Sequence, residues 1–271
     1  MKKKAFKVLL TLGLLATCGY YATKTFGEWG ADQLECNTIQ LPADVLPGAG
    51  SLRIAFFADL HNRRDHLETC IREIEAAKPD LIIFGGDFIS IAERFMRTRW
   101  AINGLKRLKN IAPTYAILGN QDYEHLEQVE RAFATAGVHI LRNEALDWQA
   151  PNGSTIRIIG LGDWNEGDEA PQQCMKPIGQ ETAPVLLLSH DPESRWLLRG
   201  YDWDFMLSGH THGGQIGNPF TGEFISFRSS MPAGSYTFEG NRRVFVTRGV
   251  GASWNIRFFC PPELNIIDIN R

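Results

Sequence analysis

The sequence has no CxxC pair among its five cysteines, so a thiolate zinc site of the kind such pairs build is not expected. It also has no internal repeat and no low-complexity tract. Apolar residues make up 44% and charged residues 22% of its 271 residues, which is ordinary for a globular protein. About 240 residues remain beyond the N-terminal segment, enough for one α/β domain with a sizeable core.

A surplus of positive charge is missing from most of the chain. The first 25 residues contain five lysines and no acid, which leaves 23 basic and 31 acidic residues for the rest. Because non-specific nucleic-acid binding depends on neutralising phosphates, we do not expect a nucleic-acid partner. Four arginines, Arg242, Arg243, Arg248 and Arg257, crowd the C-terminal part. We expect them to be solvated, with a substrate clamp as the alternative.

The longest apolar run is short for a membrane span. Val8–Ala22 has 15 mostly apolar residues after a lysine cluster, whereas a span needs about 20. This pattern is typical of a secretory signal or a short anchor. We expect residues 1–25 to be an uncleaved anchor, with a lipoprotein signal or a cleaved signal as alternatives. Residues 26–50 are expected to be a tether, and residues 51–271 one folded domain. Since lysine clusters stay cytoplasmic, this domain should lie on the extracytoplasmic side of the membrane.

Five short apolar runs are each followed by side chains that can bind a metal ion. The runs are Ile54–Ala58, Leu81–Phe84, Tyr115–Leu118, Val185–Ser189 and Phe205–Ser208. The residues that follow them are Asp59 and His61, Asp87, Asn120 and Asp122, His190, and His210 with His212. Each run is typical of a buried strand, and open α/β sheets place their sites at the carboxyl ends of strands. One edge of a sheet could therefore collect the ligands of two metal ions.

The order of the elements predicts an α/β fold. Helices expected at His66–Lys78, Ala92–Leu108 and Tyr123–Ala136 alternate with strands, which favours parallel pairing in the first half. After Gly153 the strands follow each other with few helices, so we expect the second half to be largely antiparallel. The prediction is a two-sheet α/β sandwich with flanking helices, preceded by an N-terminal apolar helix.

The candidate ligands share a chemistry without sulfur. Carboxylate, amide and imidazole groups suit Mn, Fe or Zn. Asp59 and His61, like His210 and His212, are two residues apart, so within each pair the side chains point to the same face of an extended strand. Each fragment alone is usually a turn or a packed histidine. The prediction therefore rests on the complete set and its order.

These blocks resemble the signature of the calcineurin-like metallophosphoesterase superfamily. The matching blocks are Asp-x-His, Gly-Asp, Gly-Asn-x-Asp, a later His and Gly-His-Thr-His, in this order across residues 59–212. Gly-His-Thr-His-Gly-Gly-Gln at 209–215 and Pro-Pro-Glu at 261–263 further resemble its small, membrane-attached bacterial phosphodiesterase branch. The resemblance implies a phosphodiesterase in which two divalent ions turn a bridging water into hydroxide, which attacks phosphorus in line.

The resemblance also implies a role for each candidate residue. Asp59, His61 and His212 would hold the first ion, and Asn120, His190 and His210 the second. Asp87 would bridge both ions. The residues implied to act in catalysis are Asp87, Asn120, Gln121 and Asp122, with Asp122 behind the ligands rather than on the metal.

One residue departs from the family pattern. Gln121 stands where the family has a histidine that is thought to contact the phosphate and protonate the leaving group. Glutamine can donate an N–H to a phosphate oxygen but has no titratable proton. Our hypothesis is that the leaving group needs little protonation, as a nucleotide phosphate or an aryl oxide would, or that another group supplies the proton.

Two alternatives remain open at this point. The substrate could be a lipid-linked nucleotide pyrophosphate of the UDP-diacylglucosamine type, because an apolar N-terminal segment and the aromatics Phe245, Trp254, Phe258 and Phe259 would suit a lipid. We expect these aromatics to be core residues. The second alternative is a non-catalytic metal-binding envelope protein that has lost activity through Gln121.

Overall fold

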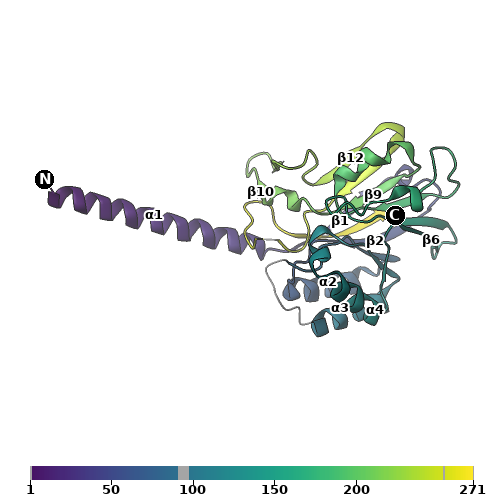
Figure 1. The fold of residues 1–271 in the computed structure, drawn as a ribbon, viewed down its shortest axis with the longest axis horizontal. Helices are drawn as coiled ribbons and strands as arrows, with labels where there is room; N and C mark the ends of the chain where they lie inside the picture. Colours follow the sequence, from purple (N-terminus) through teal and green to yellow (C-terminus); the bar gives the residue numbers. More distant parts are fainter. Residues whose placement is uncertain (1, 91–97, 253, 271) are drawn as a thin grey trace.

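Two six-stranded sheets pack face to face, and three helices cover the outer face of the first sheet (Figure 1). The computed structural model describes residues 2–90, 98–252 and 254–270. This arrangement confirms the predicted two-sheet α/β sandwich.

The first sheet contains the strands that lead into three of the five predicted ligand blocks. In spatial order it consists of β1 (Glu35–Leu41), β14 (Glu263–Ile269), β2 (Leu52–Phe57), β3 (Leu81–Phe84), β4 (Thr114–Ala116) and β5 (His139–Ile140). Strands β2 to β5 are mutually parallel, and β14 runs antiparallel to β2. The carboxyl ends of β2, β3 and β4 therefore meet at one edge of the sheet.

The connections between these parallel strands are helical, as the alternation predicts. They are α2 (Arg64–Ala77), α3 (Thr98–Ile111) and α4 (Leu126–Ala136), the last preceded by the 3-10 helix η2 (Asn120–His125). The start of the helix predicted at Ala92–Leu108 lies partly outside the described residues, since 91–97 are not described. Alternate residues of β2 face these helices or the second sheet: Ala55 and Phe57 pack toward α2, and Ile54 and Phe56 between the sheets.

The second sheet corrects the prediction of a largely antiparallel second half. Its order is β12 (Gly234–Thr237), β13 (Arg243–Val246), β9 (Phe205–Ser208), β8 (Val185–Leu188), β7 (Thr155–Gly160) and β6 (Glu144–Gln149). The four central strands are parallel, and only the two edge strands pair antiparallel. The crossovers are loops with the 3-10 helices η3 (Pro171–Gln173) and η4 (Pro192–Gly200), so the alternation of helix and strand that indicates parallel pairing is missing. Strands β8 and β9 are buried along their whole length, which is the usual signature of a parallel sheet.

Beyond β9 the chain adds several small elements. These are η5 (His212–Gln215), the hairpin of β10 (Ile216–Gly217) and β11 (Phe224–Ile225), and η6 (Glu239–Asn241). The strand predicted at Ile256–Phe259 forms only an isolated bridge between Phe258 and Ile216.

The N-terminal region begins with a long helix, and the segment after it differs from the expected tether. Helix α1 runs from Lys2 to Ala31 and extends away from the sheets (Figure 1). In the part of the chain that the structure describes, no helix combines the length and the apolar character needed to cross a membrane. The expected tether, residues 26–50, instead contains the end of α1, strand β1 and the 3-10 helix η1 (Ala43–Val45). Strand β1 pairs along its whole length with β14, so this segment is built into the fold.

Three residues of this segment are core residues, and they generate a first prediction. Val45, Leu46 and Ala49 are fully buried between the sheets. Leu46→Ala should lower the free energy of unfolding by about 2–5 kcal/mol, because it removes buried methyl groups and leaves a cavity. The midpoint of thermal unfolding should fall by roughly 5–15 °C. Leu197→Ala, at a half-exposed position, is the control and should change stability by less than about 0.5 kcal/mol. If both variants had the same melting temperature, residues 26–50 would be a tether that does not contribute to the core.

Candidate metal centre

The ligand blocks of both sheets converge where the carboxyl ends of their parallel strands meet. Asp59 follows β2 and donates its backbone N–H to the carbonyl of Gly86 at 2.8 Å, which joins the ends of β2 and β3. His190 follows β8 of the other sheet, and its ring Nδ1 lies 2.7 Å from the carbonyl of Gly85. The two sheets are therefore connected through the site itself.

Four of the seven predicted ligands form one buried cluster. The ligand atoms of Asp59, His61, Asp87 and His212 all lie within 4.8 Å of one another. His61 Nε2 is 3.7 Å from Asp87 Oδ2, and His212 Nε2 is 3.5 Å from Asp59 Oδ1. Each of these four residues is at most 6% exposed.

The histidine geometry of this cluster fits a cation. Nδ1 of His61 lies 3.1 Å from the carbonyl of Ile89, and a ring N–H that donates there leaves a lone pair on Nε2. That Nε2 faces Nε2 of His212 at 3.1 Å. Burial lowers the pKa of both rings, so both are neutral near pH 7. Two ring nitrogens at this distance beside two carboxylates match the donor set of a divalent metal ion.

His190 joins the cluster from the second sheet. Its Nδ1–H donates to Gly85, so Nε2 points at Asp87 Oδ2 at 3.5 Å and at Asp59 Oδ1 at 3.8 Å. Burial alone would lower the pKa of His190, but the charges of Asp87 and Asp59 raise it well above its ordinary value. The two carboxylates thus attract a cation to this point, and a metal ion would compete with the proton on His190.

The remaining predicted ligands, Asn120 and His210, lie beside this cluster. Nδ1 of His210 is 3.0 Å from Oδ1 of Asn120, and the backbone N–H of His210 donates to the carboxylate of Asp59 at 3.2 Å. Gly119 connects this pair to the cluster, because a Cβ there would lie 2.3 Å from Asp87 Oδ1 and 2.7 Å from His190 Nε2. Only glycine allows such an approach.

Sequence reasoning missed a carboxylate in this half of the site. Asp191 Oδ2 is 3.6 Å from Nε2 of His210 and accepts a hydrogen bond from Asn165. Its position directly after His190 was the available signal.

The backbone of the site is strained. Five of the seven predicted ligands have positive φ, a region that residues with a Cβ seldom adopt. They are Asp59 (56°), His61 (45°), Asp87 (55°), His210 (69°) and His212 (53°). Such conformations cost about 1–3 kcal/mol each and persist only where the surroundings impose them, which occurs mainly at functional sites. Here the hydrogen bonds between loops impose them, for example from His61 N to the carbonyl of Asp87 at 3.2 Å.

Asp122 holds two of these loops together. Its Oδ1 accepts from the backbone N–H groups of Phe88 and Ile89, at 2.9 and 3.2 Å, and its Oδ2 from Gly119 at 3.0 Å. This carboxylate therefore fixes the loops that carry Asp87 and Asn120, which makes it a positioning residue. The neighbouring Gln121 is buried, and its backbone N–H donates to Asp87 Oδ1 at 2.9 Å.

Arg257 is a second residue that sequence reasoning missed, and the expectation of a solvated side chain is wrong for it. The side chain is fully buried and donates to the carbonyls of Arg248, Gly251 and His212, at 2.6, 2.5 and 3.2 Å. It thereby connects three loops behind the predicted metal ligand His212. A single arginine inside the apolar run Ile256–Phe259 was the available signal.

Arg248 is also buried rather than solvated. Its Nη2 forms an ion pair with Oε2 of Glu263 at 2.6 Å. Glu263 is the glutamate of the Pro-Pro-Glu block at 261–263, so this ion pair gives that residue a structural role.

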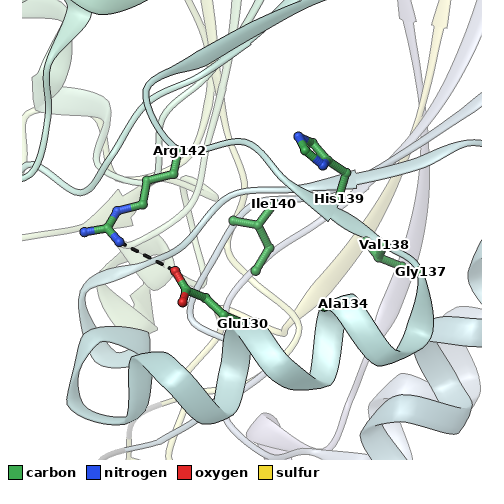
Figure 2. Close-up of a pocket in the computed structure, with 7 residues that line it drawn as sticks. All are labelled: Glu130, Ala134, Gly137, Val138, His139, Ile140 and Arg142. Atoms are coloured by element: carbon green, nitrogen blue, oxygen red, sulfur yellow. Dashed lines mark ion pairs between the residues drawn. The ribbon is translucent and has the colours of Figure 1, made fainter.

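A hollow elsewhere on the surface takes no part in this site. It measures about 440 Å³ and lies between α4 and β5 (Figure 2). The lining residues are Glu130, Ala134, Gly137, Val138, His139, Ile140 and Arg142. Arg142 and Glu130 form an ion pair of 3.5 Å at its side. None of the predicted site residues lines it.

Known proteins with similar sequences carry related names. The chain is 33% identical to Phosphodiesterase YaeI of Escherichia coli over 82% of its length and 83% of that protein. It is 28% identical to the metallophosphoesterase YkuE of Bacillus subtilis, over 96% of the chain and 93% of that protein. It is also 28% identical to the UDP-2,3-diacylglucosamine pyrophosphatase LpxG of Chlamydia trachomatis, over 79% of the chain and 82% of that protein.

A family model agrees with the geometry of the centre. The model described as calcineurin-like phosphoesterase matches residues 52–214, from the start of β2 to just beyond His212. This range contains every predicted metal ligand. The convergent carboxylates and imidazoles, the sequence relatives and the family match lead to one conclusion: this chain belongs to the calcineurin-like phosphoesterase family.

Proposed function

We propose that this protein is a phosphodiesterase that uses two divalent metal ions. The position of Asp87 carries the proposal. Its Oδ2 lies 3.7 Å from Nε2 of His61 and 3.5 Å from Nε2 of His190, so one carboxylate faces a histidine from each half of the site. That is the placement required of a residue shared by two ions.

The proposed ligand sets follow from this placement. Asp59, His61 and His212 would hold one ion, and Asn120, His190 and His210 the other. The oxygen and imidazole donors suit Mn, Fe or Zn. When bound, two such ions activate a water and neutralise charge on the phosphoryl group.

The chain's own residues have three tasks in this proposal. The glycine-lined loops and the strained backbone hold the ligands before substrate arrives. Asp122 fixes the two loops that carry Asp87 and Asn120. Gln121, whose backbone contacts Asp87, can donate an amide N–H to a phosphate oxygen but cannot protonate a leaving group.

The substrate class is supported by the relatives rather than by the metal centre alone. YaeI carries the name phosphodiesterase, which favours a diester. LpxG carries the name of a nucleotide–lipid pyrophosphatase, and the exposed aromatic side chains of this chain favour a lipid-linked pyrophosphate as the second candidate. Both substrates have phosphate groups with two substituents.

Hydrolysis of bis-p-nitrophenyl phosphate with added Mn²⁺ tests the proposed activity. Asp87→Asn should lower kcat/KM at least about 100-fold, because even residues behind metal ligands cost 10–100-fold when they are changed. Asp147→Asn, on the exposed face of β6, should leave the rate unchanged. Absence of Mn²⁺-dependent hydrolysis by the native protein would favour the non-catalytic metal-binding alternative.

The buried carboxylates make the effect of metal on stability depend on pH. Burial, with the charge of Asp87, raises the pKa of Asp59 to about 7, and the same causes raise the pKa of Asp122 to about 7. Between about pH 4 and 7 these two carboxyl groups keep protons in the folded metal-free protein that they have lost in the unfolded chain, so their contribution to stability falls as pH rises. A bound cation needs the ionised carboxylates, so its stabilising effect grows over the same range.

The predicted result is a gap in melting temperature, between Mn²⁺-loaded and chelated protein, that widens from pH 5 to pH 8. Metal at 100 times its dissociation constant adds about 2.7 kcal/mol, or roughly 5–10 °C. Asp59→Asn should raise the melting temperature of the chelated protein at pH 8 and shrink the gap. Differential scanning fluorimetry measures both. A gap that narrows as pH rises would contradict the carboxylate-based site.

The glutamine at position 121 predicts a dependence on the leaving group. Gln121→His should raise kcat/KM for alkyl esters more than for aryl esters, because only poor leaving groups need protonation. General acid catalysis contributes about 10²–10⁴-fold, so the difference should be measurable. Gln121→Asn, which keeps an amide, is the matched control. Equal changes for both ester classes would show that residue 121 does not govern proton transfer.

A further inference from the structure

Exposed aromatic side chains gather where α1 joins the domain. We call them the aromatic collar, and they come from the end of α1, from the β10–β11 hairpin region and from the segment before Cys260. They are Phe26, Trp29, Phe220, Phe227, Trp254 and Phe259. The expectation that Trp254 and Phe259 are core residues is wrong, since they are 79% and 54% exposed.

The three segments of the collar touch one another. Phe26 of α1 lies 5.5 Å from the ring of Phe259 and 5.8 Å from Trp29. Gly217 of β10 donates its N–H to the carbonyl of Phe258 at 2.7 Å. Figure 1 shows β10 on the side of the domain from which α1 leaves. The rings of Phe26, Trp29 and Phe259 therefore form one cluster at the base of the helix, and the β10–β11 hairpin lies beside it.

The foot of α1 is fixed to the domain. The backbone N–H of Arg257 donates to the carbonyl of Gly27 at 2.8 Å. A Cβ at Gly30 would lie 2.2 Å from the carbonyl oxygen of Arg257, so only glycine permits this approach. The helix and the collar thus keep one orientation relative to each other.

Two collar residues are almost fully exposed to solvent. Phe220 and Phe227 are 95% and 93% exposed. Single exposed apolar side chains are normal, whereas several exposed aromatic side chains in adjoining segments are typical of an interaction site. Aromatic rings are also favoured where an apolar phase meets water.

The chemistry of α1 identifies the partner. The helix continues the collar with exposed Leu15, Tyr20 and Tyr21. The first 25 residues contain five lysines and no acid, which complements anionic lipid head groups. Protein interfaces, by contrast, are depleted in lysine. A helix with a basic end and exposed apolar residues can bind at a membrane surface without crossing it.

We propose that the aromatic collar is a membrane-contacting surface that enters the head-group region of an anionic bilayer together with α1. The surface is connected to the segment that follows the predicted ligand His212. Gln215, three residues after His212, donates from its side chain to the carbonyls of Trp254 and Ile256, at 2.9 and 2.7 Å. This inference is independent of the reaction that the centre performs.

Binding to vesicles tests the surface with the full-length chain. The probe is a mixture of phosphatidylcholine and phosphatidylglycerol, compared with phosphatidylcholine alone. The triple variant Phe220→Ser/Phe227→Ser/Trp254→Ser should lower the partition coefficient at least about tenfold, because three apolar groups no longer enter the bilayer. Its melting temperature should not change, since these side chains are exposed. Trp196→Ser, a half-exposed tryptophan that contacts Arg195, is the matched control and should bind like the native chain.

A second measurement separates the collar from α1, which could bind lipid by itself. Brominated lipids should quench tryptophan fluorescence in the native protein, and Trp254→Phe should lose a clear part of that quenching while it keeps its lipid affinity. Unchanged partition of the triple variant together with unchanged quenching in Trp254→Phe would overturn the proposal. If the native protein does not bind vesicles and instead self-associates, the collar is a protein-contact surface. That result would also overturn the proposal.

Discussion

Repulsion between two buried carboxylates is the constraint on which the rest of the structure depends. Asp59 and Asp87 place their oxygens within 4.8 Å of each other, and neither side chain is exposed to water. Such a pair is costly unless a cation or a proton lies between them. The imidazoles of His61, His190 and His212 surround the pair, which makes the point suitable for metal ions rather than for a structural ion pair.

The fold places these two carboxylates where the parallel strands of both sheets present their carboxyl ends to each other. Loops and the first residues of the 3-10 helices η2 and η5 carry the predicted ligands, so the positions of these side chains depend on connections between neighbouring loops. Asp122 connects the Asp87 and Asn120 loops, and Arg257 connects the loops around His212. Hydrogen bonds between the loops, these among them, maintain the positive φ of the five predicted ligands. The centre is thus prepared by residues that need not touch substrate.

Much of this arrangement could be predicted because the strands of the site are short, apolar and followed at once by polar ligands. The local pattern indicates each strand, and the rule for strand ends brings the ligands together. Edge strand β1 could not be predicted in the same way, since its half-exposed sequence resembles a loop and its pairing with β14 joins residues far apart in the chain. Parallel pairing of β7, β8 and β9 was missed because no α-helix connects them. The roles of Arg257 and Trp254 depend on tertiary burial, which reverses what composition suggests for an arginine and a tryptophan.

Anomalous X-ray diffraction from crystals grown with Mn²⁺ tests the central claim most directly. We expect two peaks about 3.5–4 Å apart, as in other two-metal sites, with Asp87 between them. One peak should lie beside Asp59, His61 and His212, and the other beside Asn120, His190 and His210. A single peak, or two peaks that do not share Asp87, would contradict the account.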